Sequence, residues 1–186
     1  RTGAVYGTGK REENLRGYFA AISAMDEQIG RLLDAVEEQG LADNTVILFT
    51  ADNGMSMGQH GVWGKGNGTF PMNMYDSAVK VPFLISWPGH IPANTVCSEM
   101  ISACDLLPTI LKLTGLSDKQ PTGLPGRSFT ELLKGEQREH RDEVVIFDEY
   151  GPVRMIRTKE WKYVHRYPYG KHELYHLVDD PGEEKN

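Results

Sequence analysis

Apolar side chains between Glu12 and Gln39 recur every three or four residues, which is the spacing of an amphipathic α-helix. Gly40 follows as a residue that readily ends a helix. The pattern therefore predicts one long helix over residues 12–39 with a single apolar face. The apolar positions are Leu15, Phe19, Ile22, Met25, Ile29, Leu32, Leu33 and Val36.

Two short apolar runs, residues 45–50 and 81–86, predict buried strands, and the first of them is rich in β-branched side chains. Strands that are apolar on both faces are typical of a buried parallel sheet. With a further helix predicted over residues 104–113, they indicate an α/β fold. A buried parallel strand needs neighbours on both sides, so we expect partner strands from a part of the protein missing from this chain.

After Gln120 the pattern changes to closely spaced prolines and glycines, a short helix over residues 128–133, and several strand-like runs. The runs cover residues 143–149, 153–158, 161–167 and 173–177 and predict an antiparallel meander. We expect residues 1–120 to form the α/β part and residues 121–186 a small antiparallel β subdomain. Most aromatic and basic side chains there, including Tyr150, Trp161 and Tyr169, are expected to be cross-strand pairs or sheet surface.

Composition narrows the partners of the chain. With 20 Lys and Arg against 26 Asp and Glu, the formal charge is -6, which argues against nucleic acid. Its apolar runs are far shorter than the roughly 20 residues of a membrane helix, so no membrane is expected. The start lacks a methionine and a signal-type stretch, so we expect a cut N-terminus and read no localisation from it. Cys97 and Cys104 are expected to be ordinary buried thiols.

Asp52 and Asn53 directly follow the first predicted strand, where ligand sites of open α/β sheets lie. A carboxylate next to an amide carbonyl is an all-oxygen pair that suits a hard cation such as Ca²⁺ or Mg²⁺. A plain turn is the alternative, because Asp-Asn-Gly is favourable turn chemistry anywhere. Calcium takes six to eight ligands, so the others would come from elsewhere.

Lys65 stands among glycines, in the order Gly-Lys-Gly-Asn-Gly, where the backbone can approach an anion closely. The segment is not a P-loop, because Gly66 occupies the position of the P-loop hydroxyl residue. A solvated loop lysine is the alternative. His60 lies between these features and could contact an anion or protonate a leaving group, or simply pack near Trp63.

In order and spacing, these segments resemble the second half of the type I sulfatase family, and the resemblance covers nearly the whole chain. His176 departs from it, standing where the family usually has Asp. The resembling segments are residues 50–54, 58–61, 63–66, 74–76, 81–85, 106–110 and 173–186.

The resemblance implies part of an alkaline-phosphatase-like mixed sheet with flanking helices, followed by a small C-terminal antiparallel sheet. It implies that Asp52 and Asn53 coordinate one Ca²⁺, with Mg²⁺ as an alternative, and that Lys65 binds the sulfate. Lys65 and His60 become the candidate catalytic residues. The implied reaction is hydrolysis of a sulfate ester by a formylglycine hydrate, with a sulfated carbohydrate as one substrate class.

The family makes formylglycine from a cysteine in Cys-x-Pro-x-Arg, and neither Cys97 nor Cys104 lies in that context. We therefore expect formylglycine in the missing N-terminal part, and expect the chain to pair with that part or to self-associate. The chain alone is expected to be inactive. A turnover assay with an aryl sulfate tests this, and sulfate release at enzyme-like rates would contradict it.

Two other functions stay open at the level of the sequence. A phosphodiesterase or phosphonate hydrolase of the same superfamily would bind a similar tetrahedral anion, although such relatives commonly have His where this chain has Asn53. A non-catalytic binding module that retains the fold is the second alternative.

Overall fold

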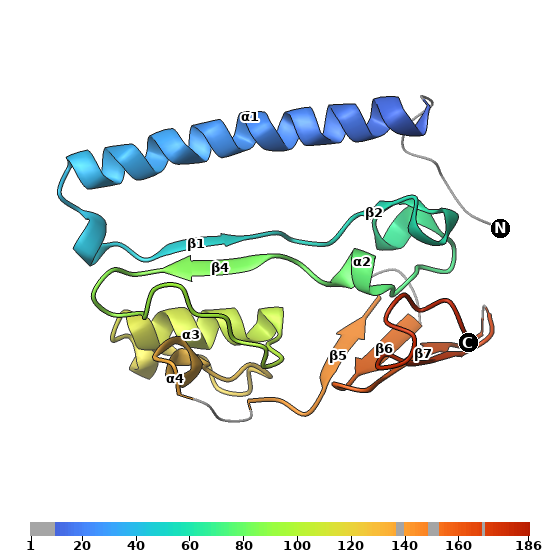
Figure 1. Ribbon diagram of the computed structural model, residues 1–186. Helices are drawn as coiled ribbons and strands as arrows, with labels where there is room; N and C mark the ends of the chain where they lie inside the picture. Colours follow the sequence, from blue (N-terminus) through green and yellow to red (C-terminus); the bar gives the residue numbers. More distant parts are fainter. Residues whose placement is uncertain (1–9, 137–139, 149–152, 169) are drawn as a thin grey trace. The chain divides into compact units, whose positions relative to one another are not determined.

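The computed structural model describes residues 10–136, 140–148, 153–168 and 170–186 (Figure 1). Contacts divide the chain into two compact units. The first unit comprises residues 1–87, 148–153 and 165–172, and the second comprises residues 88–147, 154–164 and 173–186. The predicted division at residues 120 and 121 stays a prediction. Tyr150 and Tyr169 lie outside the described residues.

The first unit begins with α1 (Arg11–Glu38), which confirms the predicted long helix. The Glu13 carboxylate accepts a hydrogen bond from the Lys10 backbone N–H at 3.1 Å and so caps the first turn. At the other end Gly40, with φ of 64°, donates to the Glu37 carbonyl. No residue of α1 is buried, and Leu32 is 68% exposed. Among the described residues, no helix is long and apolar enough to cross a membrane.

Strand β1 (Ile47–Thr50) pairs with β4 (Phe83–Ser86), and α1 runs along this pair (Figure 1). The two strands are antiparallel, with Ile47 opposite Ser86. The expectation of buried, parallel strands was wrong for this pair. The strands are antiparallel and their residues are half-buried or exposed, because an apolar run says nothing of strand direction or of what covers it. The connecting segment returns the chain without a crossover, which leaves the antiparallel arrangement.

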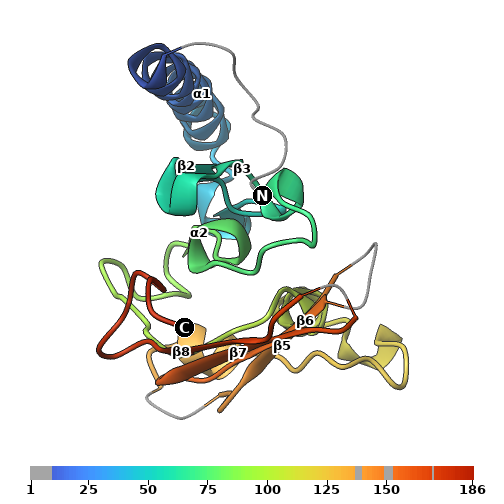
Figure 2. The ribbon, with the colours of Figure 1, turned by 90° about the vertical axis from the view of Figure 1, so that its right-hand side faces the viewer.

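The segment between β1 and β4 has no apolar periodicity in its sequence, yet it is folded into several short elements (Figure 2). Each is held by local hydrogen bonds rather than by a periodic apolar pattern, which is why the sequence did not reveal them. The elements are β2 (Ser56–Met57), η2 (Gln59–Gly61), β3 (Trp63–Gly64), η3 (Gly66–Gly68) and α2 (Asp76–Val79).

The four C-terminal strands form one sheet in the order β5-β6-β7-β8, which confirms the predicted meander. Trp161 lies opposite His176, and their rings are 4.4 Å apart, as expected for a cross-strand pair. The sheet buries Met155 and Val164 almost completely. The strands are β5 (Val144–Phe147), β6 (Val153–Arg157), β7 (Trp161–Arg166) and β8 (Glu173–His176).

A buried ion pair attaches the C-terminal segment to this sheet. The Lys162 ammonium, on β7, donates to the Glu183 carboxylate at 2.5 Å, and both side chains are buried. The Asp180 carboxylate accepts the backbone N–H groups of Glu184 and Lys185 at 3.0 and 2.8 Å. The acidic residues of the closing segment therefore hold the chain end in place.

The second unit also contains α3 (Leu106–Leu113) and α4 (Thr130–Leu133), with η4 (Ala103–Asp105) before α3 and η5 (Ser117–Lys119) after it. Cys97 and Cys104 are both exposed, so the expectation of buried thiols was wrong. In η4 the neighbouring Asp105 is the residue turned into the protein, which leaves Cys104 at the surface.

The fully buried Asp105 carboxylate connects three segments of the second unit. It accepts the backbone N–H groups of Ser102 and Arg127 at 2.9 and 2.8 Å, and the Arg141 Nε at 2.6 Å. Burial acts to raise the pKa of Asp105, but the hydrogen bonds from Arg141, Arg127 and Ser102 outweigh it, so the pKa lies below its ordinary value. Asp105 also raises the pKa of Arg141 through their hydrogen bond.

Asp105→Asn is expected to lower the free energy of unfolding by about 3 kcal/mol, because Arg141 loses its buried charge partner. Urea unfolding followed by circular dichroism measures this. Because the folded-state pKa is lowered, the charge contribution is present above the ordinary carboxyl pKa and is lost as pH falls through the lowered value. The control is Asp118→Asn, which removes one partner of an exposed ion pair with Lys119. It should lower the free energy of unfolding by less than about 1 kcal/mol. Equal losses for both variants would contradict the proposed anchoring role.

Candidate metal and anion site

The turn after β1 presents two side-chain oxygens in the first unit. The Asn53 backbone N–H donates to Asp52 Oδ1 at 2.8 Å, and Asn53 Nδ2 donates to the Gly54 carbonyl at 3.0 Å. The second bond orients the amide so that Asn53 Oδ1 remains available as an acceptor. Asp52 is exposed, and its Oδ2 makes no hydrogen bond within the described part of the chain.

Gly54 fixes this turn against α2. Its backbone N–H donates to the Ala78 carbonyl at 2.9 Å. A Cβ at this position would lie 2.2 Å from the Ser77 carbonyl oxygen, which is far inside van der Waals contact. Close by, the hydroxyls of Ser56 and Ser77 are 2.8 Å apart. Only glycine therefore allows the backbone after Asn53 to approach α2 this closely.

Lys65 directly follows β3, and its side chain reaches the turn that follows β1. Its Nζ donates to Asn53 Oδ1 at 3.1 Å, so the structure brings these two predicted site residues together. The lysine is exposed and has no ion pair with a carboxylate of the described residues. Its ammonium charge is therefore available to an anion near Asn53.

His60 is held by stacking rather than by hydrogen bonds. Its backbone has φ of 54°, in the left-handed region, between Gly58 and Gly61, which also have positive φ. The imidazole stacks on the Tyr75 ring at 3.6 Å between centroids and 4° between planes. No hydrogen bond joins His60 to Asp52, Asn53 or Lys65 in the described structure. The histidine thus packs on Tyr75, whereas the sequence suggested Trp63.

Sequence reasoning missed Asn73, which holds the backbone of Lys65 in place. Its buried Nδ2 donates to the carbonyls of Lys65 and Gly66 at 3.3 and 3.0 Å. Its backbone N–H also donates to the Gly66 carbonyl, at 3.0 Å. Asn73 Oδ1 is buried without a hydrogen-bond partner in the described residues. The sequence feature that could have identified Asn73 is its position directly before residues 74–76, one of the segments that resemble the family.

The donor chemistry of the turn fits a hard cation. Asp52 and Asn53 offer oxygen atoms only, which are the ligands that a hard cation prefers. Within the described ranges, no three His, Cys, Asp or Glu side chains gather to hold a metal. The two residues would thus supply part of a coordination shell, as the sequence predicts.

Comparison with known proteins assigns the family. The family model described as Sulfatase matches residues 2–116, more than half of the chain. The chain belongs to the sulfatase family. Its fold neighbours are alkaline-phosphatase-like sulfatases, which agrees with the mixed α/β architecture and the small antiparallel sheet.

The chain is similar to sulfatases of differing specificity. It is 31% identical to an N-acetylglucosamine-6-O-sulfatase of Bacteroides thetaiotaomicron, over 95% of this chain and 32% of that protein. It is 32% identical to a choline-sulfatase of Rhizobium meliloti, over 94% of this chain and 34% of that protein. A solved structure in complex with its substrate D-glucosamine-2-N,6-O-disulfate superposes with a TM-score of 0.84 at 29% identity, over 95% of this chain and 36% of that one. The chain therefore spans about a third of the length of these relatives, in their C-terminal portion.

Gly54→Ala is expected to destabilise the protein by about 1–3 kcal/mol, because the new Cβ forces the turn away from α2. Thermal unfolding measures the change. Gly17→Ala is a matched control in α1, where the space is open, and it should stabilise by up to about 1 kcal/mol through helix propensity. A neutral or stabilising effect of Gly54→Ala would show that the turn does not need this close approach.

Proposed function

We propose that this chain is the C-terminal part of a sulfatase that hydrolyses sulfate esters, and that Lys65 binds the sulfate group beside a cation held by Asp52 and Asn53. The contact between Lys65 Nζ and Asn53 Oδ1 at 3.1 Å carries the proposal. It joins the anion-binding candidate to the metal-binding candidate, so one sulfate group can contact both. The oxygen-only donors favour Ca²⁺, with Mg²⁺ as the alternative.

Such a cation would polarise the sulfate oxygens and stabilise the negative charge that develops as the S–O bond to the leaving group breaks. Lys65 would supply a second positive charge to the same oxygens and fix the orientation of the group. Asn73 holds the Lys65 backbone, so the ammonium acts from a prepared position rather than a mobile loop. The formylglycine nucleophile would come from a part of the sulfatase outside this sequence.

His60 is proposed to contact the sulfate or to give a proton to the departing alcohol. Stacking on Tyr75 fixes the plane of its ring while leaving the nitrogens at the ring edge for hydrogen bonding. The left-handed backbone at His60, flanked by glycines, is the kind of costly conformation found at functional sites.

The remainder of the sulfatase is proposed to cover the apolar face of α1. Phe19 and Leu32 on this helix are 59% and 68% exposed, and the relatives are about three times as long as this chain. An amphipathic helix normally buries its apolar face against a sheet or another helix. Self-association of the isolated chain through the same face is the alternative outcome.

A sulfated carbohydrate is the proposed substrate. It is supported by the name of a similar protein, an N-acetylglucosamine-6-O-sulfatase, and by a similar solved structure that is a complex with a disulfated glucosamine. Phosphodiester or phosphonate hydrolysis is less favoured, because the similar proteins named above are sulfatases and Asn53 supplies an amide oxygen to the site.

In the full-length protein that carries this chain, Lys65→Met should lower kcat/KM for a sulfate ester by about 10²–10³-fold, the usual cost of removing one group that stabilises charge in a transition state. Steady-state release of sulfate measures this. Lys119→Met removes an exposed lysine of the second unit and should leave kcat/KM unchanged. Unchanged kinetics in Lys65→Met would overturn the sulfate-binding role.

Asp52→Asn separates the metal role from the anion role. This change should weaken Ca²⁺ binding by more than about tenfold, since loss of an outer-shell partner alone costs about 10–100-fold in metal affinity. Calorimetric titration of the metal-stripped full-length protein with Ca²⁺ measures it. Asp118→Asn is the matched control, and the same affinity in both variants would place the cation elsewhere.

A further inference from the structure

Two exposed aromatic side chains lie in the unit that carries the candidate site. Phe70 is 78% exposed and Tyr167 is 68% exposed. Single exposed aromatic residues are common and mean little by themselves. These two differ because their segments, almost a hundred residues apart in the sequence, are attached to each other next to Lys65.

Phe70 lies at the tip of a closed loop that starts directly after Lys65. Asn73 closes this loop by bonding its backbone and side-chain N–H groups to the Gly66 carbonyl, each at 3.0 Å. Inside the loop, the Thr69 hydroxyl donates to the Pro71 carbonyl at 2.8 Å. The same backbone segment therefore positions the ammonium of Lys65 at its base and the ring of Phe70 at its tip.

The connection between β7 and β8 is fastened to this loop by Arg166. The guanidinium is almost fully buried, and its Nη1 donates to the Met72 carbonyl at 2.6 Å. The Arg166 carbonyl accepts the Gly170 N–H at 3.1 Å. A Cβ at Gly170 would lie 3.7 Å from Pro71 Cγ, so the two segments pass close to each other beside Phe70.

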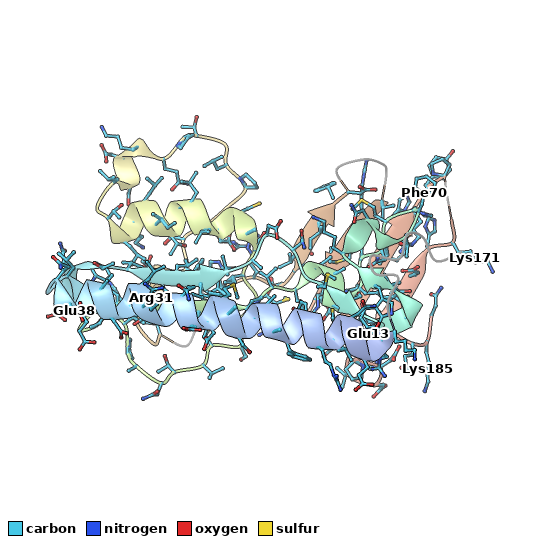
Figure 3. The ribbon with its side chains drawn as sticks, turned by 90° about the horizontal axis from the view of Figure 1, so that it is seen from above. Glu13, Arg31, Glu38, Phe70, Lys171 and Lys185 are labelled. Carbon is cyan, nitrogen blue, oxygen red and sulfur yellow. The ribbon has the colours of Figure 1, made fainter. Side chains whose placement is uncertain are left out.

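Positive charge accompanies the aromatic rings. Lys171 is exposed on the same connection, and Figure 3 shows Lys171 and Phe70 both extending outward from their segments. The rings of His165 and His172 stack at 4.5 Å, and His172 Nδ1 accepts the Arg166 N–H at 3.1 Å. Together with Lys65 and the Arg166 guanidinium, Lys171 favours an anionic substrate and disfavours a cationic one such as a quaternary ammonium ester.

We propose that Phe70 and Tyr167 form a sugar-binding wall, and this proposal rests on the proposed function. The pyranose ring that carries the sulfate packs against this wall. An exposed aromatic ring offers a flat apolar surface to the C–H face of a sugar, and it loses little conformational entropy on binding. Lys171 contacts a further acidic substituent of the saccharide, and Arg166 is a positioning residue that holds the wall to the loop. The substrate class is thus an acidic sulfated saccharide.

The test uses the full-length protein, a panel of sulfated monosaccharides, and ethyl sulfate as a probe without a ring. The measured quantity is kcat/KM for the best sugar sulfate divided by kcat/KM for ethyl sulfate. Phe70→Ala should lower this ratio by about tenfold, the loss expected for about one aromatic contact. Phe70→Trp keeps a flat ring and should retain the ratio, whereas Phe70→Leu keeps an apolar side chain without one and should not.

Phe147→Ala is the matched control, since Phe147 is a 66% exposed phenylalanine of the second unit and should leave the ratio unchanged. An unchanged ratio in Phe70→Ala, or a wild-type protein that hydrolyses ethyl sulfate but no sugar sulfate, would overturn the wall while leaving the sulfatase proposal intact. A wild-type protein that hydrolyses no sulfate ester would overturn both.

Discussion

The contact between the Lys65 ammonium and the Asn53 amide oxygen depends on how closely the backbone folds back on itself after β1. Two constraints produce it. Gly54 allows the turn to lie against the Ser77 carbonyl, and the buried Asn73 amide holds the backbone at Lys65. If either constraint fails, the proposed cation-binding and anion-binding groups separate and can no longer contact the same sulfate.

Elsewhere, buried charged groups connect segments that are distant in the sequence. Asp105 joins three segments of the second unit, and the Lys162–Glu183 pair attaches the closing segment to the sheet. Such pairs cost desolvation energy, but removing one partner leaves an uncompensated charge. They therefore specify which segments meet. The acidic residues of the C-terminal segment stabilise the fold, whereas Lys65 and Asn53 belong to the proposed site.

Within the first unit, contacts link Lys65, the proposed sulfate-binding residue, through the loop that follows it to the β7–β8 connection. Arg166 extends the site into the last quarter of the sequence by bonding to Met72. The β7–β8 connection can therefore influence the proposed site without supplying a catalytic group. The shape of the loop tip, set by Asn73 and Arg166, would decide which alcohol is presented along with its sulfate.

The sequence by itself determined the long helix, the C-terminal meander and the candidate residues Asp52, Asn53 and Lys65, because periodicity and contiguous motifs are local properties. Only the tertiary structure decided that β1 and β4 are antiparallel, that Cys104 faces solvent while Asp105 is buried, and that His60 stacks on Tyr75. Strand direction and side-chain partners depend on the path of the chain between elements. The 94-residue separation of Arg166 from Met72 leaves no trace in any local pattern, because only folding brings the two together.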